Sequence, residues 1–312
     1  MSSTLLKIAI IGEGVIGVST ALAIRQALPK AVIKIFSDRP FEDTTSFGPA
    51  GIFRFNEDRY KSWAEKTFNF WAKLEREESP LNTGESLEKL EKAFGSIVYN
   101  FRWLTQRELS LISYAAEGRR FVSYLKNQLG NTVEYKTQKI ESIKELANQD
   151  FSLIVNCAGL GGGKLAGDDE NVFPNRGVGI VVKAPGQSHF CYEDADTFCI
   201  PVVGDDRVLL GTLRQDNRWD REISREDIND IWTRVTELKP SLKHSEVVSE
   251  WCGLRPDRKG GVRLEHKLLE DDKTNKQIHV IHNYGHGAKG FLLSWGCARE
   301  VLELIKNKGI CE

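Results

Sequence analysis

The chain has 312 residues, of which 40% are hydrophobic and 28% are charged, and its formal net charge is −1. This profile is typical of a globular protein with one large or two packed domains, and it gives no general attraction to nucleic acid or to an anionic membrane. The six cysteines show no CxxC pair and no zinc-ligand spacing, so we expect reduced thiols and no metal. Because no signal-peptide pattern and no apolar run of about eighteen residues occurs, neither secretion nor a membrane span is expected.

A glycine motif follows the first apolar run of the chain. The run 8–11 predicts a strand, 18–28 predicts a helix, and Gly12, Gly14 and Gly17 lie between them in the spacing G-x-G-x-x-G. In a βαβ unit such a turn lets a pyrophosphate approach the backbone at a helix N-terminus. The motif predicts a dinucleotide site and leaves NAD, NADP and FAD open. The residues we expect at the cofactor here are Gly12, Gly14, Val15, Ile16 and Gly17.

A second parallel strand is predicted at 31–36. Asp38 follows it, about 20 residues after the glycines, where an acidic residue can bind the adenosine ribose. Arg39 is placed to meet a phosphate, and the loop 44–51 is rich in hydroxyl groups that could line phosphate or ribitol oxygens. The residues expected at the cofactor in this region are Ser37, Asp38, Arg39, Thr44, Thr45, Ser46 and Gly51.

The next part of the chain contains two predicted helices, 57–78 and 118–129, with aromatic residues spaced to form a core. The charged stretch 75–92 is interpreted as a solvated surface segment. A strand is expected at 132–135, and the apolar run 151–159 predicts a central strand that leads into a second glycine cluster at the cofactor.

From residue 177 the pattern changes to short strands separated by turns, at 179–182, 198–202 and 207–212. They predict an antiparallel sheet in a second domain. A helix at 224–238 follows, with Ser224 as its N-cap. The strand 278–282 and the helix 294–306 are expected to return the chain to the first domain.

Three stretches together resemble the D-amino-acid oxidase family of FAD-dependent flavoproteins: the glycine motif, Gly-Leu-Arg-Pro-x-Arg at 253–258, and Asn-Tyr-Gly-His-Gly-x-x-Gly at 283–290. Weaker matches at 139–142 and 155–159 agree. The resemblance implies an α/β protein, with a Rossmann-type FAD-binding domain interleaved with a mixed or antiparallel-sheet substrate domain. The boundaries we expect are 1–52, 130–176 and 270–312 for the FAD-binding domain, and 53–129 and 177–269 for the substrate domain.

The resemblance also implies a reaction, in which hydride passes from Cα of a D-amino acid to the flavin, the imino acid hydrolyses, and O₂ yields hydrogen peroxide. By position in the family, Arg258 would bind the substrate α-carboxylate, the carbonyl of Ala288 would accept from the amine, and Arg255 would be structural. Hydride transfer from a neutral amine needs no strong base, so no catalytic base is expected. Further cofactor contacts implied by the resemblance are Ile140, Gly159, His286, Gly287, Lys289, Gly290, Phe291 and Leu292.

Arg214 bears on the substrate class. An arginine stands before a glutamine at this place in the D-aspartate oxidase branch of the family, which acts on acidic D-amino acids, and its charge suits a second carboxylate. Arg218 is a nearby alternative. The family usually has a tyrosine where this chain has Phe198, so we expect weaker substrate binding unless Tyr192 or another group supplies the hydroxyl.

Other functions stay open on the sequence: oxidation of neutral D-amino acids, an NAD-dependent dehydrogenase, or a flavin-binding protein with little turnover. The tail Ile310-Cys311-Glu312 is not a peroxisomal signal of the Ser-Lys-Leu type, which favours the cytoplasm, although the family also allows a peroxisomal location. The expected partners are a small acidic substrate and O₂, with no nucleic acid and no membrane, and the oligomeric state is left open.

Overall fold

A computed structural model describes residues 5–48, 51–53, 57–78, 115–147, 149–187, 190–194, 196–202, 205–270 and 277–310. Its first sheet has six strands in the order β13-β14-β6-β1-β2-β5, parallel except for the edge strand β13. The bounds are β1 Lys7–Ile11, β2 Val32–Ser37, β5 Val133–Thr137, β6 Leu153–Asn156, β13 Arg263–Glu270 and β14 Gln277–Tyr284. This is the predicted Rossmann-type sheet.

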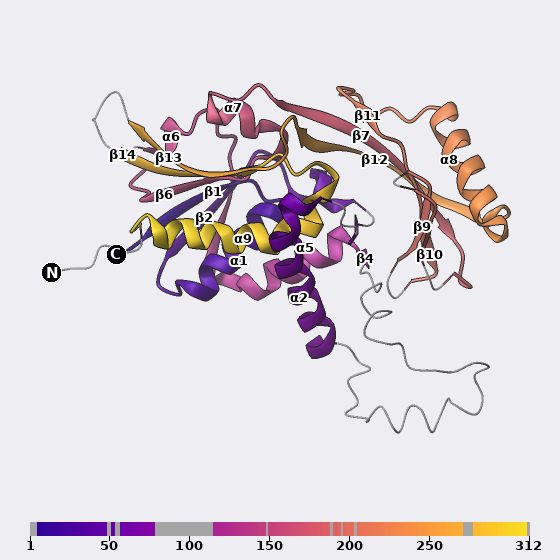
Figure 1. Ribbon diagram of the computed structural model, residues 1–312, viewed down its shortest axis with the longest axis horizontal. Helices are drawn as coiled ribbons and strands as arrows, with labels where there is room; N and C mark the ends of the chain where they lie inside the picture. The colour runs from indigo at the N-terminus through magenta and orange to yellow at the C-terminus, as the bar shows by residue number, and fades with distance from the viewer. Residues whose placement is uncertain are drawn as a thin grey trace, which may run out of the picture.

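Helices cover both faces of this sheet. Figure 1 shows α1 and α9 side by side on one face, and α5 joins them in a common apolar core. The opposite face carries α6 and a second core that includes Ile140 and Ile154. A parallel sheet is buried on both faces in this way because its crossover connections place helices there. The bounds are α1 Val15–Ala27, α5 Gly118–Leu129, α6 Lys144–Ala147, α7 Gly162–Ala166 and α9 Gly290–Asn307.

The second sheet is antiparallel, as predicted, with the order β11-β7-β10-β9-β8 and with β12 paired to β7. Helix α8 covers its outer face in Figure 1 and is capped by Ser224 through a complete capping box with Asp227. The inner face carries Val181, Ile200 and Leu209. The bounds are β7 Val172–Lys183, β8 Cys191–Tyr192, β9 Phe198–Pro201, β10 Arg207–Gly211, β11 Gln215–Asp216, β12 Glu246–Arg258 and α8 Arg225–Leu238.

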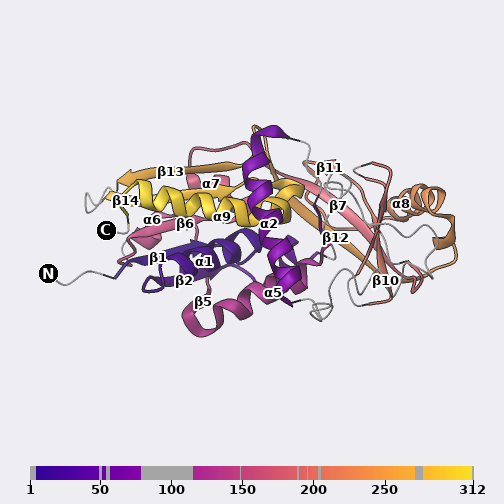
Figure 2. The ribbon, with the colours of Figure 1, turned by 60° about the horizontal axis from the view of Figure 1, so that its bottom comes forward.

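The long strands β7 and β12 join the two sheets, as Figures 1 and 2 show. Their paired residues run from Glu246 opposite Lys183 to Arg258 opposite Val172. One end of this ladder therefore lies in the antiparallel sheet, and the other end lies beside the glycine loops of the first sheet.

Helices α2 (Lys61–Glu78) and α5 contact the helices that cover the first sheet. Both fall in 53–129, which we assigned to the substrate domain, yet α2 packs on α9 and α5 packs on α1. Their apolar faces supply the reason, because Val122, Leu125 and Leu129 complete the core over α1. A two-stranded ladder of β3 (Gly51–Ile52) and β4 (Ala115–Ala116) lies nearby.

Most of the segment interpreted as solvated surface, 79–92, lies outside the described residues. The helices α1 and α9 begin three and four residues earlier than expected, at Val15 and Gly290, because both start directly at a glycine turn. No helix within the described ranges is long and apolar enough to span a membrane.

Candidate functional site

The turn between β1 and α1 can be built only from glycine at two of its positions. Gly12 has a φ of +115°, and a Cβ atom there would lie 2.4 Å from the carbonyl oxygen of Cys157. A Cβ atom on Gly17 would lie 1.9 Å from the carbonyl oxygen of Gly12. These backbone approaches bring the start of α1 directly against the end of β1, which is the geometry that a dinucleotide turn requires.

The N-termini of α1 and α9 meet at the carboxyl edge of the parallel sheet. A Cβ atom on Gly290 would lie 3.7 Å from the Val15 side chain, and neither helix has an acidic residue in its first turn. Each helix carries a partial positive charge at this end, where its first N–H groups have no partner inside the helix. The two ends therefore form one anion-attracting region without using a charged side chain.

Asp38 and Arg39 follow β2, at the edge of this region. The Arg39 guanidinium donates to both carboxylate oxygens of Asp38, at 2.8 and 2.7 Å, and lowers the pKa of Asp38. Both side chains remain partly exposed. The hydroxyl of Ser37 donates to the carbonyl of Arg39 and fixes the turn.

The loop 44–48 connects the glycine turn to the substrate strands. The Ser46 hydroxyl accepts from the backbone N–H of Val15 at 3.0 Å, and the Thr45 hydroxyl donates to the carbonyl of Leu254 on β12 at 2.7 Å. The hydroxyl of Thr44 donates to the carbonyl of Phe41. Of the three predicted hydroxyls, only that of Ser46 lies directly at the helix terminus where phosphate oxygens would bind.

The loop after β14 contains a buried polar atom without a partner among the described residues. His286 is buried, its Nε2 has no hydrogen bond, and burial lowers its pKa to about 3. The loop turns through Gly285 and Gly287, which adopt φ values of +83° and +56° and lie against Arg258 and Asp257. The neutral imidazole is held between these two turns, and its free nitrogen is available to form a hydrogen bond with a polar atom of a ligand.

The remaining predicted cofactor residues surround this loop or lie deeper in the fold. Phe291 packs against Gly51, and Lys289 forms an ion pair with Glu57 at 2.7 Å. Leu292 is buried in the core beside α2, and Ile140 is buried in the core under α6. Gly159 has a φ of +55° and lies near Pro256.

These features together fit a bound dinucleotide. The glycine cradle and the paired helix ends suit a pyrophosphate, Asp38 suits a ribose, and the unpartnered atoms Nε2 of His286 and Oδ1 of Asn283 suit polar ring edges. Asn283 also donates to the Thr20 hydroxyl at 3.3 Å, which ties the end of β14 to α1. The fit extends from the adenosine end to the loop before α9.

Arg255 lies on the inner face of the antiparallel sheet, and its hydrogen-bond partners are neutral groups. Its guanidinium donates to Asn175 Oδ1 at 2.9 Å, to the carbonyl of Leu213 at 3.1 Å and to the hydroxyl of Thr212 at 3.0 Å. It packs over Gly177, where a Cβ atom would clash with it at 2.3 Å. No described carboxylate lies within ion-pair distance of it. Burial, assisted by the charge of Arg214, lowers its pKa to about 10.

Arg258, three residues along β12, has a different environment. It donates to the carboxylate of Asp169 at 2.8 Å and to the carbonyl of Gly261 at 3.1 Å, beside a hollow of about 420 Å³. Burial alone would raise the pKa of Asp169, but hydrogen bonds from Arg258, Tyr284 and Asn171 hold it well below its ordinary value. Arg258 is thus already neutralised by a protein carboxylate. Its expected role at the substrate α-carboxylate stays a prediction.

Arg214 and Phe198 lie beside Arg255 in the same sheet. Arg214 donates to Asp196 at 2.6 Å with both side chains 42% exposed, so this pair can open to water. The Phe198 ring covers Gly211, where a Cβ atom would lie 2.4 Å from it. Arg218 pairs instead with Asp220 and Gln215. Of the expected substrate residues, Phe198 therefore lies on β9 and Arg214 lies between β10 and β11, whereas Ala288 lies in the short turn before α9.

Two residues that we did not assign to the site now belong to its candidate set. Arg255 lies in the Gly-Leu-Arg-Pro stretch, where the resemblance implies a structural role. The Trp251 ring covers Gly253 and reaches the loop 44–48, since a Cβ atom on Gly48 would lie 2.9 Å from it. An aromatic residue two positions before a Gly-Leu-Arg-Pro stretch was the only available signal for Trp251.

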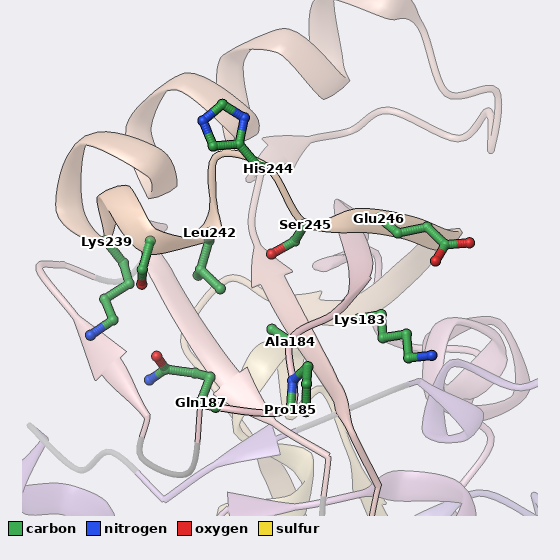
Figure 3. A pocket seen from close by; sticks show the side chains of 11 residues that line it. Lys183, Ala184, Pro185, Gln187, Lys239, Leu242, His244, Ser245 and Glu246 are labelled. Atoms are coloured by element: carbon green, nitrogen blue, oxygen red, sulfur yellow. The ribbon is translucent and has the colours of Figure 1, made fainter.

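A separate hollow of about 530 Å³ lies at the far end of the antiparallel sheet (Figure 3). Lys183, Gln187, Lys239 and His244 are among the residues that line it. None of the predicted site residues lines this hollow, so it is distinct from the region between the two sheets.

Comparison with known proteins agrees with this geometry. The family model described as "FAD dependent oxidoreductase" matches residues 7–304. The chain is 44% identical to D-aspartate oxidase 1 of Caenorhabditis elegans, over 96% of this chain and 97% of that protein, and 33% identical to D-aspartate oxidase of Homo sapiens, over 96% and 95%. Its fold is similar to that of glycine oxidase from Geobacillus kaustophilus, with a TM-score of 0.70 and 18% identity over 97% and 95% of the chains. The glycine cradle, the meeting helix ends and these matches lead to one conclusion: the chain belongs to the FAD-dependent oxidoreductase family of the D-amino-acid oxidases.

Proposed function

We propose that the protein is an FAD-dependent oxidase of acidic D-amino acids, D-aspartate and D-glutamate. It converts them to 2-oxo acids, with ammonia and hydrogen peroxide as the other products and O₂ as the electron acceptor. The observation that carries the proposal is Arg255, a half-buried cation whose hydrogen-bond partners among the described residues are all neutral, near a second arginine, Arg214. The names of the similar proteins support it.

Arg255 is the group that we assign to the substrate α-carboxylate. A buried cation without a counter-ion is costly, and a carboxylate that docks on it removes this cost. The planar guanidinium can donate two parallel hydrogen bonds to such a group. Asn175 and Thr212 hold the guanidinium flat against Gly177 before substrate arrives, which reduces the entropy lost on binding.

Arg214 is assigned to the side-chain carboxylate. Arg255 donates to the carbonyl of Leu213, the residue before Arg214, so the two arginines are neighbours, and we assign one dicarboxylate to both. The price of binding is the opening of the Arg214–Asp196 pair, which is small because exposed ion pairs contribute only about 0–1 kcal/mol. A substrate without a second carboxylate would leave Arg214 with Asp196 and would gain less.

Arg255 and Arg214 would fix the two carboxylate ends of the substrate, and this defines the direction of its Cα–H bond. FAD, when bound, supplies the acceptor for the hydride. This chain holds the carboxylates of the substrate between Arg255 and Arg214 while Phe198 and Trp251 exclude water from the same face. His286 stays neutral over the ordinary pH range and requires no role as a general base. Positioning of the substrate is therefore the main contribution of the protein.

The test compares peroxide formation from D-aspartate and from D-alanine by wild-type protein and by Arg214→Leu. We expect D-aspartate to be strongly preferred by the wild type, and Arg214→Leu to lose that preference while it keeps bound flavin. Arg218→Leu is the matched control and should leave the preference unchanged, because Arg218 pairs with Asp220. Equal activity of the wild type on both substrates would instead support a neutral D-amino-acid oxidase, and absence of bound flavin would remove the proposal.

A further inference from the structure

Two cysteines face each other across the hairpin formed by β8 and β9. Cys191 is directly opposite Cys199, the next pair is Tyr192 and Phe198, and the N–H of Glu193 donates to the carbonyl of Thr197 at 2.9 Å where the hairpin closes. Directly opposed residues of antiparallel strands have Cα atoms roughly 4.5–5.5 Å apart, which lies within the range of about 4.4–6.8 Å found in disulfides.

Their side chains lie on the same face of the sheet. Both cysteines pack into the core under α8, and both are free thiols. Cys252, the third cysteine of this sheet, is opposite Val178 and so faces no thiol across the ladder. The backbone spacing of the Cys191–Cys199 pair therefore suits a disulfide, which distinguishes this pair from Cys252.

The two thiols differ in their access to solvent. Cys199 is fully buried, which raises the pKa of its thiol to about 11. Cys191 is half-buried, and its Sγ accepts from Nε2 of Gln187 at 3.8 Å. Gln187 also lines the hollow of about 530 Å³ shown in Figure 3. Cys191 is therefore the more accessible thiol, and its partner Gln187 borders this hollow, whereas Cys199 has no exposed surface.

We propose that Cys191 and Cys199 are an oxidation site that hydrogen peroxide converts reversibly to a disulfide. Sγ of Cys191 attacks one peroxide oxygen, the O–O bond breaks, and water leaves with the thiol proton, which gives a sulfenic acid. Sγ of Cys199 then attacks the sulfenic sulfur, the S–O bond breaks, and a second water leaves as the S–S bond forms. Two thiols are oxidised and one peroxide is reduced to two waters.

The source of peroxide rests on the proposed oxidase activity, which releases it in the same molecule. The hairpin also carries two groups of the substrate region. Asp196 in its turn pairs with Arg214, and Phe198 beside Cys199 covers Gly211. The modification therefore lies on the strand that positions these groups.

The experiment uses reduced, flavin-loaded wild-type protein and added hydrogen peroxide in small molar excess. After catalase treatment, free thiols are alkylated and the protein is cleaved before Asp194, which separates the two cysteines onto different peptides. We expect a linked peptide pair, lighter than the two thiol peptides by two hydrogen atoms and abolished by dithiothreitol. Cys191→Ser should keep Cys199 alkylatable, and the matched control Cys252→Ser should form the link at the wild-type yield.

A second sample receives D-aspartate and air in place of peroxide. If added peroxide links the cysteines but turnover does not, the oxidation site stands and the proposed function is weakened. If Cys191 and Cys199 both stay alkylatable under added peroxide, the proposal is wrong. Linkage of Cys191 to a different cysteine, or its conversion to sulfinic acid without linkage, would also overturn it. The wild-type mapping alone decides the question if Cys191→Ser does not fold.

Discussion

The turn between β1 and α1 attracts an anion with backbone groups, whereas the antiparallel sheet does so with arginine side chains. At the turn, two helix ends meet and no charged side chain is needed. At the sheet, Arg255 keeps its charge among neutral acceptors and Arg214 shares its charge with an exposed carboxylate. The glycine turn depends on the close approach of backbone segments. The antiparallel sheet depends on which face of a strand each arginine side chain occupies.

The largest expected effect is the loss of the cofactor from Gly17→Ala. The added Cβ would lie 1.9 Å from the carbonyl oxygen of Gly12, so backbone would have to move in the turn that receives the pyrophosphate. We expect the purified variant to lack the flavin absorbance of the wild type. Gly186→Ala is the control, because no heavy atom lies within 4 Å of its added Cβ. Retention of wild-type flavin content by Gly17→Ala would contradict this account of the turn.

The next largest effect is expected from Arg255→Leu. Removal of one partner of a buried charge pair costs roughly 2–5 kcal/mol, which corresponds to a decrease in kcat/KM of about 30-fold to several thousand-fold. Flavin content should not change. Arg255→Lys should recover only part of the loss, because the ammonium cannot donate two parallel hydrogen bonds.

The variant Arg258→Leu tests whether the two arginines of β12, Arg255 and Arg258, have different roles. It would leave the buried Asp169 carboxylate unpaired, so we expect a loss of folding stability of about 3–5 kcal/mol, measured by urea unfolding. The combined Arg258→Leu and Asp169→Asn variant should recover part of this stability. If Arg258→Leu instead raises KM for D-aspartate at unchanged stability, Arg258 binds the substrate as the sequence predicted, and our assignment of Arg255 fails.

A smaller effect is expected on the free energy of unfolding when the pH is lowered from 7 to 5. Burial lowers the pKa of His286 to about 3 and that of His282 to about 4. The unfolded chain binds these protons below about pH 6.5, so each histidine stabilises the fold above that pH and loses this contribution as the pH falls, by about 2 kcal/mol at pH 5. Urea unfolding at pH 7 and pH 5 measures the difference, and His286→Gln should reduce it. An unchanged pH dependence in that variant would argue against a buried neutral imidazole.

The smallest expected effect is a gain in binding from Phe198→Tyr. A restored hydroxyl near the substrate carboxylate adds one hydrogen bond to a charged group, worth roughly 1.5 kcal/mol, or about a tenfold lower KM for D-aspartate. Phe190→Tyr, in the same apolar cluster, is the control and should leave KM unchanged. An unchanged KM in Phe198→Tyr would show that the absent hydroxyl does not limit binding.

The comparison also explains what could be predicted from sequence. The glycine turn, the parallel sheet and the Ser224 cap are local patterns, and each was predicted close to where the structure has it. The environments of Arg255 and Arg258 could not be predicted. Side chains three positions apart on a strand point to opposite faces, and only the tertiary packing shows that one face meets Gly177 and the other meets Asp169. The packing of α2 on α9 and of α5 on α1 likewise depends on tertiary contacts.

The most direct test of the central claim is anaerobic reduction of the bound flavin by substrate. We expect D-aspartate to bleach the flavin absorbance of the wild type much faster than D-alanine, and Arg255→Leu to retain flavin that D-aspartate bleaches only slowly. Such a result would support binding of the substrate α-carboxylate by Arg255 and recognition of a second carboxylate by the protein. Flavin that D-aspartate leaves unbleached in the wild type, or that Arg255→Leu bleaches at the wild-type rate, would contradict the account.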